Sequence, residues 1–226
     1  MQMMALVTGG ASCGKSAYAE DLCMESGAPL VYLAAMRPFG EEGAARVRKH
    51  RAQRAGKGFT TIECYEGLDA VLCDDRIEGA TLLLECLGNV VANELFSQEQ
   101  STPASDSEQL SQPARAQGEA LAPASAASSD LSPAPDAESA PASALGPEDI
   151  VVHKLERQIL VMRDRCRCLV IVGNEVGSDG VSYAPETQAY QHVLGRLSCL
   201  LAAHSDVVAE SVAGIPVVLK DSEVVA

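Results

Sequence analysis

The chain has 226 residues and a formal net charge of −14, with eight Cys, no Trp and 4% aromatic residues. This length allows one large domain or two small ones. No apolar run approaches the roughly 20 residues of a membrane span, and the first residues lack the pattern of a signal peptide. The acidity argues against nonspecific nucleic-acid binding. We therefore expect a cytoplasmic protein whose cysteines are reduced thiols.

The apolar pattern predicts strands that alternate with helices. Short apolar runs bounded by turn residues indicate buried strands, and longer periodic segments indicate helices. We expect, in chain order, strands at 5–8, 30–34, 59–62, 81–84, 168–173, 206–210 and, at an edge, 216–219, with helices at 16–23, 41–54, 68–73, 90–96, 150–165 and 185–204. Fully apolar strands alternating with helices are typical of a parallel sheet covered on both faces. The sequence thus predicts an α/β fold.

A low-complexity segment divides the chain. Residues 97–148 hold 13 Ala, 11 Ser and 7 of the 11 Pro, with eight acids and one base, so they carry half of the net charge. Such a composition cannot bury enough apolar surface to offset the entropy of ordering. We expect 97–149 to be a disordered insert in a single domain made of 1–96 and 150–226. The insert could be a solvated linker or a tether for a partner.

A phosphate-binding motif follows the first predicted strand and precedes a predicted helix, in the form G-x-x-x-x-G-K-[ST]. Its glycines let successive backbone N–H groups point at phosphate oxygens beside a helix N-terminus. Lys15 would neutralise the β- and γ-phosphates, and the Ser16 hydroxyl would bind Mg²⁺. The nucleotide-binding residues expected here are Gly9, Gly10, Ala11, Ser12, Cys13, Gly14, Lys15 and Ser16.

An acid at the end of a neighbouring strand usually acts together with a P-loop. Glu85 directly follows the apolar run 81–84. It could orient Mg²⁺, a water or an acceptor hydroxyl. The alternative is an ordinary carboxylate at a solvated strand end.

The predicted helix 41–54 lies in a local excess of positive charge, because residues 37–57 hold seven bases and two acids. Arg46, His50 and Arg54 are four residues apart, so they share one helix face. Guanidinium groups on both sides of an imidazole suit an anionic substrate. A neutral imidazole there could attack phosphorus and hold a phosphoramidate. From spacing alone, the favoured interpretation is a solvated basic helix that carries an incidental histidine.

The order and spacing of these motifs resemble the bifunctional adenosylcobinamide kinase/adenosylcobinamide-phosphate guanylyltransferase family of cobalamin biosynthesis. The similarity covers nearly all of residues 4–96 and 150–220. The segments that carry it are 6–16, 31–34, 46–50, 61–64, 83–86, 174–177 and 195–196.

The resemblance implies a RecA-like P-loop fold and two reactions. A kinase would move the γ-phosphate of GTP or ATP to the aminopropanol hydroxyl of adenosylcobinamide. A transferase would move GMP from GTP to that phosphate through guanylylated His50, releasing pyrophosphate. The resemblance also implies Mg²⁺ and a homo-oligomer, in this family often a trimer. The site residues that it implies are catalytic His50, Lys15 and Glu85, supporting Arg46, and nucleotide-binding Ala34, Ala35, Met36, Arg51, Ala52, Gln53, Arg54, Glu63 and Glu85.

The chain departs from the family pattern in the P-loop, in the segment 178–185, at 191–192 and in the insert of 52 residues. Ala11-Ser12-Cys13 stands where family P-loops commonly read Ala-Arg-Ser, and Gln191-His192 stands where the family usually has an Arg-Asp pair. Two other functions therefore stay open. One is a P-loop small-molecule kinase without the guanylyltransferase step, and the other is a non-catalytic RecA-like nucleotide-binding module.

Overall fold

The computed structural model describes residues 2–27, 29–37, 40–54, 56–65, 67–96, 146–177, 180–181 and 183–222, although several side chains of the helix at 40–54 are not among them. The described residues belong to one compact unit of the chain. Residues 97–145, the bulk of the predicted insert, lie outside the described residues.

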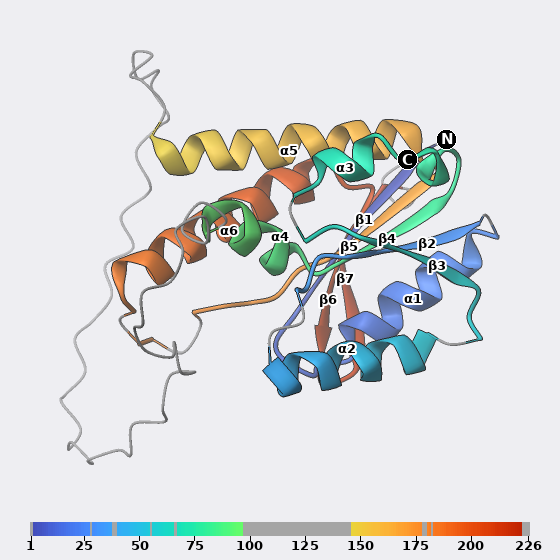
Figure 1. Ribbon diagram of the computed structural model, residues 1–226, viewed down its shortest axis with the longest axis horizontal. Helices are drawn as coiled ribbons and strands as arrows, with labels where there is room; N and C mark the ends of the chain where they lie inside the picture. Colours follow the sequence, from blue (N-terminus) through green and yellow to red (C-terminus); the bar gives the residue numbers. More distant parts are fainter. Residues whose placement is uncertain are drawn as a thin grey trace. The chain divides into compact units, whose positions relative to one another are not determined.

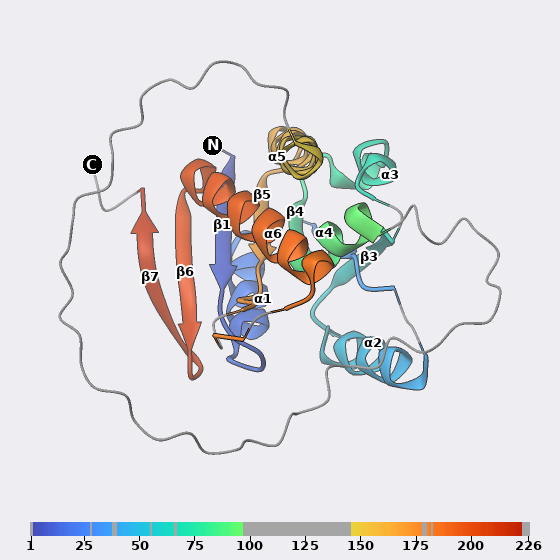
Figure 2. The same cartoon turned by 90° about the vertical axis from the view of Figure 1, so that its left-hand side faces the viewer.

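A seven-stranded sheet forms the centre of this unit, with the strand order β3-β2-β4-β5-β1-β6-β7 (Figures 1 and 2). The strands are β1 (Met3–Thr8), β2 (Leu30–Ala34), β3 (Phe59–Glu63), β4 (Thr81–Glu85), β5 (Cys168–Val172), β6 (Val207–Val212) and β7 (Ile215–Asp221). Neighbouring strands are parallel except at the β7 edge, where β7 pairs antiparallel with β6. The predicted α/β fold with a mostly parallel sheet is confirmed.

Helices cover both faces of the sheet. In Figure 1, α1 (Lys15–Glu25) and α2 (Gly40–Arg54) lie on one side. The other side carries α3 (Asp69–Leu72), α4 (Leu87–Phe96), α5 (Pro147–Arg165) and α6 (Pro185–His204). A short 3-10 helix, η1 (Asp75–Ile77), precedes β4. None of the described helices is long and apolar enough to cross a bilayer.

The helix expected from 150 begins three residues earlier, because α5 starts at Pro147. Proline at the start of a helix loses no backbone hydrogen bond. Glu148 and Asp149 in the first turn also complement the helix dipole. These residue types resemble the composition of the insert, and they were assigned to it for that reason.

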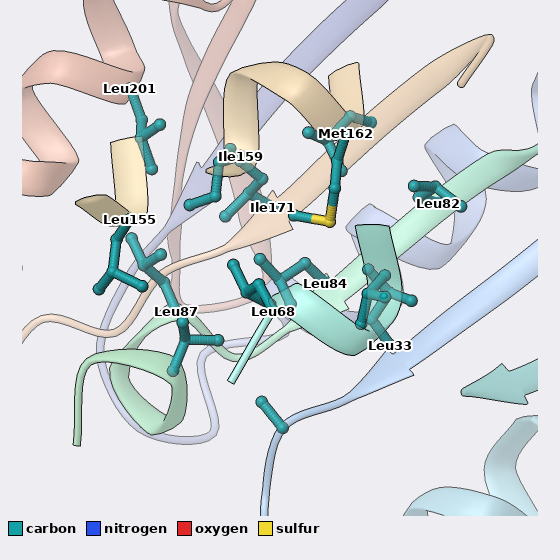
Figure 3. Packing of buried hydrophobic residues seen from close by; sticks show 14 of the residues in the cluster. Leu33, Leu68, Leu82, Leu84, Leu87, Leu155, Ile159, Met162, Ile171 and Leu201 are labelled. Carbon is teal, nitrogen blue, oxygen red and sulfur yellow. The ribbon is translucent and has the colours of Figure 1, made fainter. Parts of the chain in front are cut away.

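Alternation along the strands divides the core into two layers. Leu82 and Leu84 of β4 belong to the larger cluster, which packs under α3 to α6 (Figure 3). Leu83, between them, belongs to a smaller cluster with Ala19 and Cys23 of α1. Because successive side chains of a strand point to opposite faces, one apolar run serves both layers. Each fully buried leucine contributes about 1.5–3 kcal/mol to this packing.

All eight cysteines are free thiols and differ in their exposure. Cys73 and Cys199 are exposed, whereas Cys23, Cys64, Cys166 and Cys168 are buried. Burial raises the pKa of Cys64 and of Cys166 to about 12, and that of Cys168 to about 11.

We expect iodoacetamide at pH 8 to modify Cys73 and Cys199 in the native protein first, because only the thiolate reacts. The buried thiols stay protonated in the folded chain above about pH 8.5, where unfolded thiols ionise. Their contribution to stability is therefore complete below that pH and is lost as the pH rises toward 11 to 12. Peptide mass spectrometry measures the order of labelling. Modification of Cys168 as fast as Cys73 would contradict this assignment.

Candidate nucleotide site

The P-loop connects β1 to α1 through backbone that glycine adopts readily. Gly9 has a φ of 145° and Gly14, the N-cap of α1, a φ of 92°. A Cβ at Gly9 would lie 2.6 Å from the carbonyl oxygen of Ser211, so a larger residue does not fit there. The buried Lys15 Nζ donates to the Gly10 carbonyl oxygen at 2.8 Å. The lysine is thus folded over the loop that would hold the phosphates.

Segments from the far end of the chain hold this loop in place. The Cys13 carbonyl oxygen accepts a hydrogen bond from Ser211 Oγ at 2.6 Å and another from the Gly214 N–H at 2.9 Å. On the other side, the Glu175 N–H donates to the Gly9 carbonyl oxygen at 3.2 Å. The β6–β7 turn and the segment after β5 therefore fix the loop between them.

Glu85 is a buried carboxylate at the end of β4, which excludes the solvated strand end as an interpretation. Ser16 Oγ donates to Glu85 Oε1 at 2.5 Å, and the Tyr32 hydroxyl donates to Oε2 at 3.1 Å. Arg54 Nη1 lies 3.5 Å from the same Oε2. Burial, and then the Glu85 charge, raise the pKa of Tyr32 well above its ordinary value, so the hydroxyl remains a donor.

A cavity of about 980 Å³ opens beside these groups. Its volume lies at the upper end of the range for small-molecule sites and is large enough for a nucleotide. The predicted site residues that line it are Ala11, Ser12, Gly14, Lys15, Ser16, Ala34, Met36, Arg54 and Glu85. Ala45 and Val47 of α2 line it as well.

Other predicted residues have different positions. Gly9, Gly10 and Cys13 form the loop without lining the cavity, and Ala35 is fully buried and does not line it either. Glu63 is exposed at the end of β3, where register places it beside Ala34. Ala52 is exposed on α2. The side chains of Arg46, His50, Arg51 and Gln53 belong to α2 but lie outside the described residues.

The sequence analysis missed eleven residues that line the cavity, among them Glu20, Tyr32, Lys57, Asn89 and Asn174. Glu20 is buried and accepts from Lys57 Nζ at 2.5 Å. Two signals in the sequence could have found some of them. Glu20 is four residues after Ser16 and so shares its helix face. Asn174 follows an apolar strand as Glu85 does, and ligands bind at the carboxyl ends of parallel strands.

The family departure at Gln191-His192 lies away from the nucleotide cavity. Both residues are on α6, and neither lines that cavity. Gln191 packs against Gly177, where a Cβ would approach its Nε2 to 2.5 Å. His192 Nε2 lies 3.8 Å from Glu148 Oε2 on α5. The altered pair therefore contacts the rest of the protein through the α5–α6 side of the sheet.

A strand, a glycine-rich loop with its lysine, a helix and an acid two strands away together define a P-loop nucleotide-binding protein. Comparison with known families gives the particular kind. The chain belongs to the family described as cobinamide kinase / cobinamide phosphate guanyltransferase, whose model matches residues 5–219.

Named relatives agree with this assignment. The bifunctional adenosylcobalamin biosynthesis protein CobU of Salmonella typhimurium is 31% identical over 223 residues, covering 96% of this chain and all of the relative. CobU of Escherichia coli is 39% identical over 42% of this chain and 51% of its own length. CobP of Pseudomonas aeruginosa is 33% identical over 48% of this chain and 62% of its own length.

Proposed function

We propose that the protein phosphorylates adenosylcobinamide on its aminopropanol hydroxyl and then guanylylates the product. The observation that carries the proposal is that Lys15, Ser16 and Glu85 line one cavity together with residues of α2, the helix that contains His50. Membership of the family and the likeness to bifunctional relatives supply the substrate class.

In the kinase step, the P-loop and the N-terminus of α1 would bind the triphosphate, and Lys15 would leave the Gly10 carbonyl to neutralise the β- and γ-phosphates. The acceptor hydroxyl would then attack the γ-phosphorus, with the buried Glu85 placed to receive its proton.

The site fits Mg²⁺, because the Ser16 hydroxyl and the Glu85 carboxylate lie together and are hard oxygen donors. Magnesium usually takes one or two carboxylates and completes its shell with water and phosphate oxygens. When bound there, it would neutralise charge on the phosphates.

In the transferase step, His50 would attack the α-phosphorus of GTP, displace pyrophosphate and hold GMP until the phosphorylated acceptor takes it. The support is positional. Val47 and Arg54, three residues before His50 and four after it, both line the cavity. Helical spacing places all three on one face of α2.

Incubation with GTP labelled at the α-phosphate tests this step. We expect an acid-labile, alkali-stable adduct that maps to His50, because a phosphoramidate behaves in this way. The His50→Ala variant should lose it entirely. His153→Ala, at an exposed histidine of α5 paired with Glu156, is the matched control and should keep it.

The outcomes separate the functions. Labelling that survives in His50→Ala would refute the assigned nucleophile. Transfer of γ-phosphate to adenosylcobinamide without an adduct would reduce the protein to a kinase. Nucleotide binding without any turnover would leave a non-catalytic module.

A further inference from the structure

The C-terminal end of α2 is held against the sheet by a buried arginine. Arg54, the last residue of the helix, is 7% exposed, and its guanidinium carbon lies 3.4 Å from the centre of the Tyr32 ring. Its Nη1 lies 3.5 Å from Glu85 Oε2. Stacking on an aromatic face and pairing with a carboxylate use both recognition modes of a guanidinium.

A second ion pair stabilises the turn that follows the helix. The Lys57 N–H donates to the Arg54 carbonyl oxygen at 3.0 Å, and Lys57 Nζ pairs with the buried Glu20 of α1 at 2.5 Å. Glu20 is one helical turn beyond Ser16. The end of α2 is therefore attached to the helix and the strand that carry Ser16 and Glu85.

These contacts give Arg54 a role that differs from binding GTP. Its charge is balanced by Glu85, and its plane is covered by Tyr32. A phosphate that took this guanidinium would remove the cationic partner of the buried Glu85 carboxylate, which is unfavourable. Glu85 in turn accepts from Ser16, so one carboxylate is shared by the P-loop helix and α2.

We propose that Arg54 is a positioning residue, which fixes the last turn of α2 on Tyr32 and Glu85 and thereby places His50, one turn earlier, for nucleotidyl transfer. The inference rests on the proposed function for His50. The position of a catalytic group affects the rate strongly, because a displacement of about 1 Å can lower the rate of the chemical step by about 10²-fold.

The experiment compares three substitutions with a matched control. Arg54→Met keeps the approximate length of the side chain but removes its charge and its planar guanidinium group. Arg54→Lys keeps only the charge, and Tyr32→Phe keeps the aromatic ring but removes the hydroxyl. The control is Arg76→Met, which breaks an exposed ion pair with Asp74 at a residue that does not line the cavity. Each variant is measured for its GTP dissociation constant, its rate of adduct formation at saturating GTP, and amide hydrogen exchange in residues 40–54.

We expect Arg54→Met to lower the adduct rate at saturating GTP by about 10²-fold. Its GTP dissociation constant should change by less than about threefold, because the guanidinium is already engaged by Glu85 and Tyr32 and a tenfold change needs 1.4 kcal/mol. Exchange in α2 should accelerate. Arg54→Lys should recover part of the rate. Tyr32→Phe should keep wild-type hydrogen exchange in α2 because its ring remains under the guanidinium, and Arg76→Met should match wild type in all three measurements.

The contrary outcomes are distinct. A raised dissociation constant, with the full rate restored by more GTP, would make Arg54 a GTP contact. Equal exchange of α2 in Arg54→Met and Arg76→Met would show that the arginine does not hold the helix. A wild-type protein that forms no adduct would overturn the function of His50 instead, and the exchange comparison would still decide whether Arg54 anchors α2.

Discussion

Replacing Lys15 with methionine is expected to lower the rate of γ-phosphate transfer by about 10³-fold, at the upper end of what one lost charge-stabilising donor costs. The ammonium is buried over the P-loop and bonded to the Gly10 carbonyl oxygen, where the phosphates would bind. Methionine keeps most of the length without the charge. The measurement is the initial rate with labelled triphosphate at saturating acceptor.

Lys154→Met is the control for this substitution. Lys154 is on α5, paired with Glu94 and outside the cavity, so its loss should leave the rate unchanged. Thermal unfolding of both variants shows whether the fold is kept. A reduction of less than tenfold for Lys15→Met would mean that the lysine does not stabilise the transferred charge.

The Leu84→Ala variant is expected to lose about 2–5 kcal/mol of unfolding free energy. Leu84 is fully buried in the larger core cluster, and a cavity at this position cannot be refilled by water. Denaturant unfolding measures the loss. Because Glu85 is the next residue, we also expect reduced kinase activity at temperatures where the variant is folded.

Val218→Ala is the matched truncation, at a residue of β7 that is 51% exposed. Surface substitutions of this kind usually change stability by about 0.5 kcal/mol or less. A cost below about 1 kcal/mol for Leu84→Ala would show that the core relaxes around the missing atoms.

The strands were predictable because apolar runs bury both faces of a parallel sheet. The runs at 81–84 and 168–172 are strands whose residues are all buried. Helix starts were harder to place. α4 begins at Leu87, right after the strand residue Glu85 and one connecting Cys, so no turn or capping residue marked its start before 90. The start of α5 was obscured by a proline and acids that resemble the insert.

Contiguity explains what could be predicted in the site. The P-loop is one stretch of sequence, and Glu85 directly follows a strand, so both carry local signals. Tyr32 and Glu20 become part of the site only because β2 and α1 are packed beside Glu85 and Lys57. Contacts between elements that are distant in the sequence produce no pattern in a short stretch of sequence, so they could not be predicted from it. Glu63 is the opposite case. The family resemblance implied that it belongs to the site, but it does not line the cavity.

The position of β1 in the sheet has a consequence for how the chain is made. β1 is synthesised before the other strands of the sheet, but its two neighbours, β5 and β6, both follow residue 145. The hydrogen bond that the Cys13 carbonyl oxygen accepts from the Gly214 N–H likewise forms only after residue 214 has been synthesised. A ribosome that has reached residue 145 has produced β2, β3 and β4 and none of the strands that flank β1. Nucleotide stabilises only a chain that can bind it. We therefore expect a chain that ends at residue 145 to gain no protection from nucleotide, because the strands and the turn that hold the phosphate loop are synthesised after the loop itself.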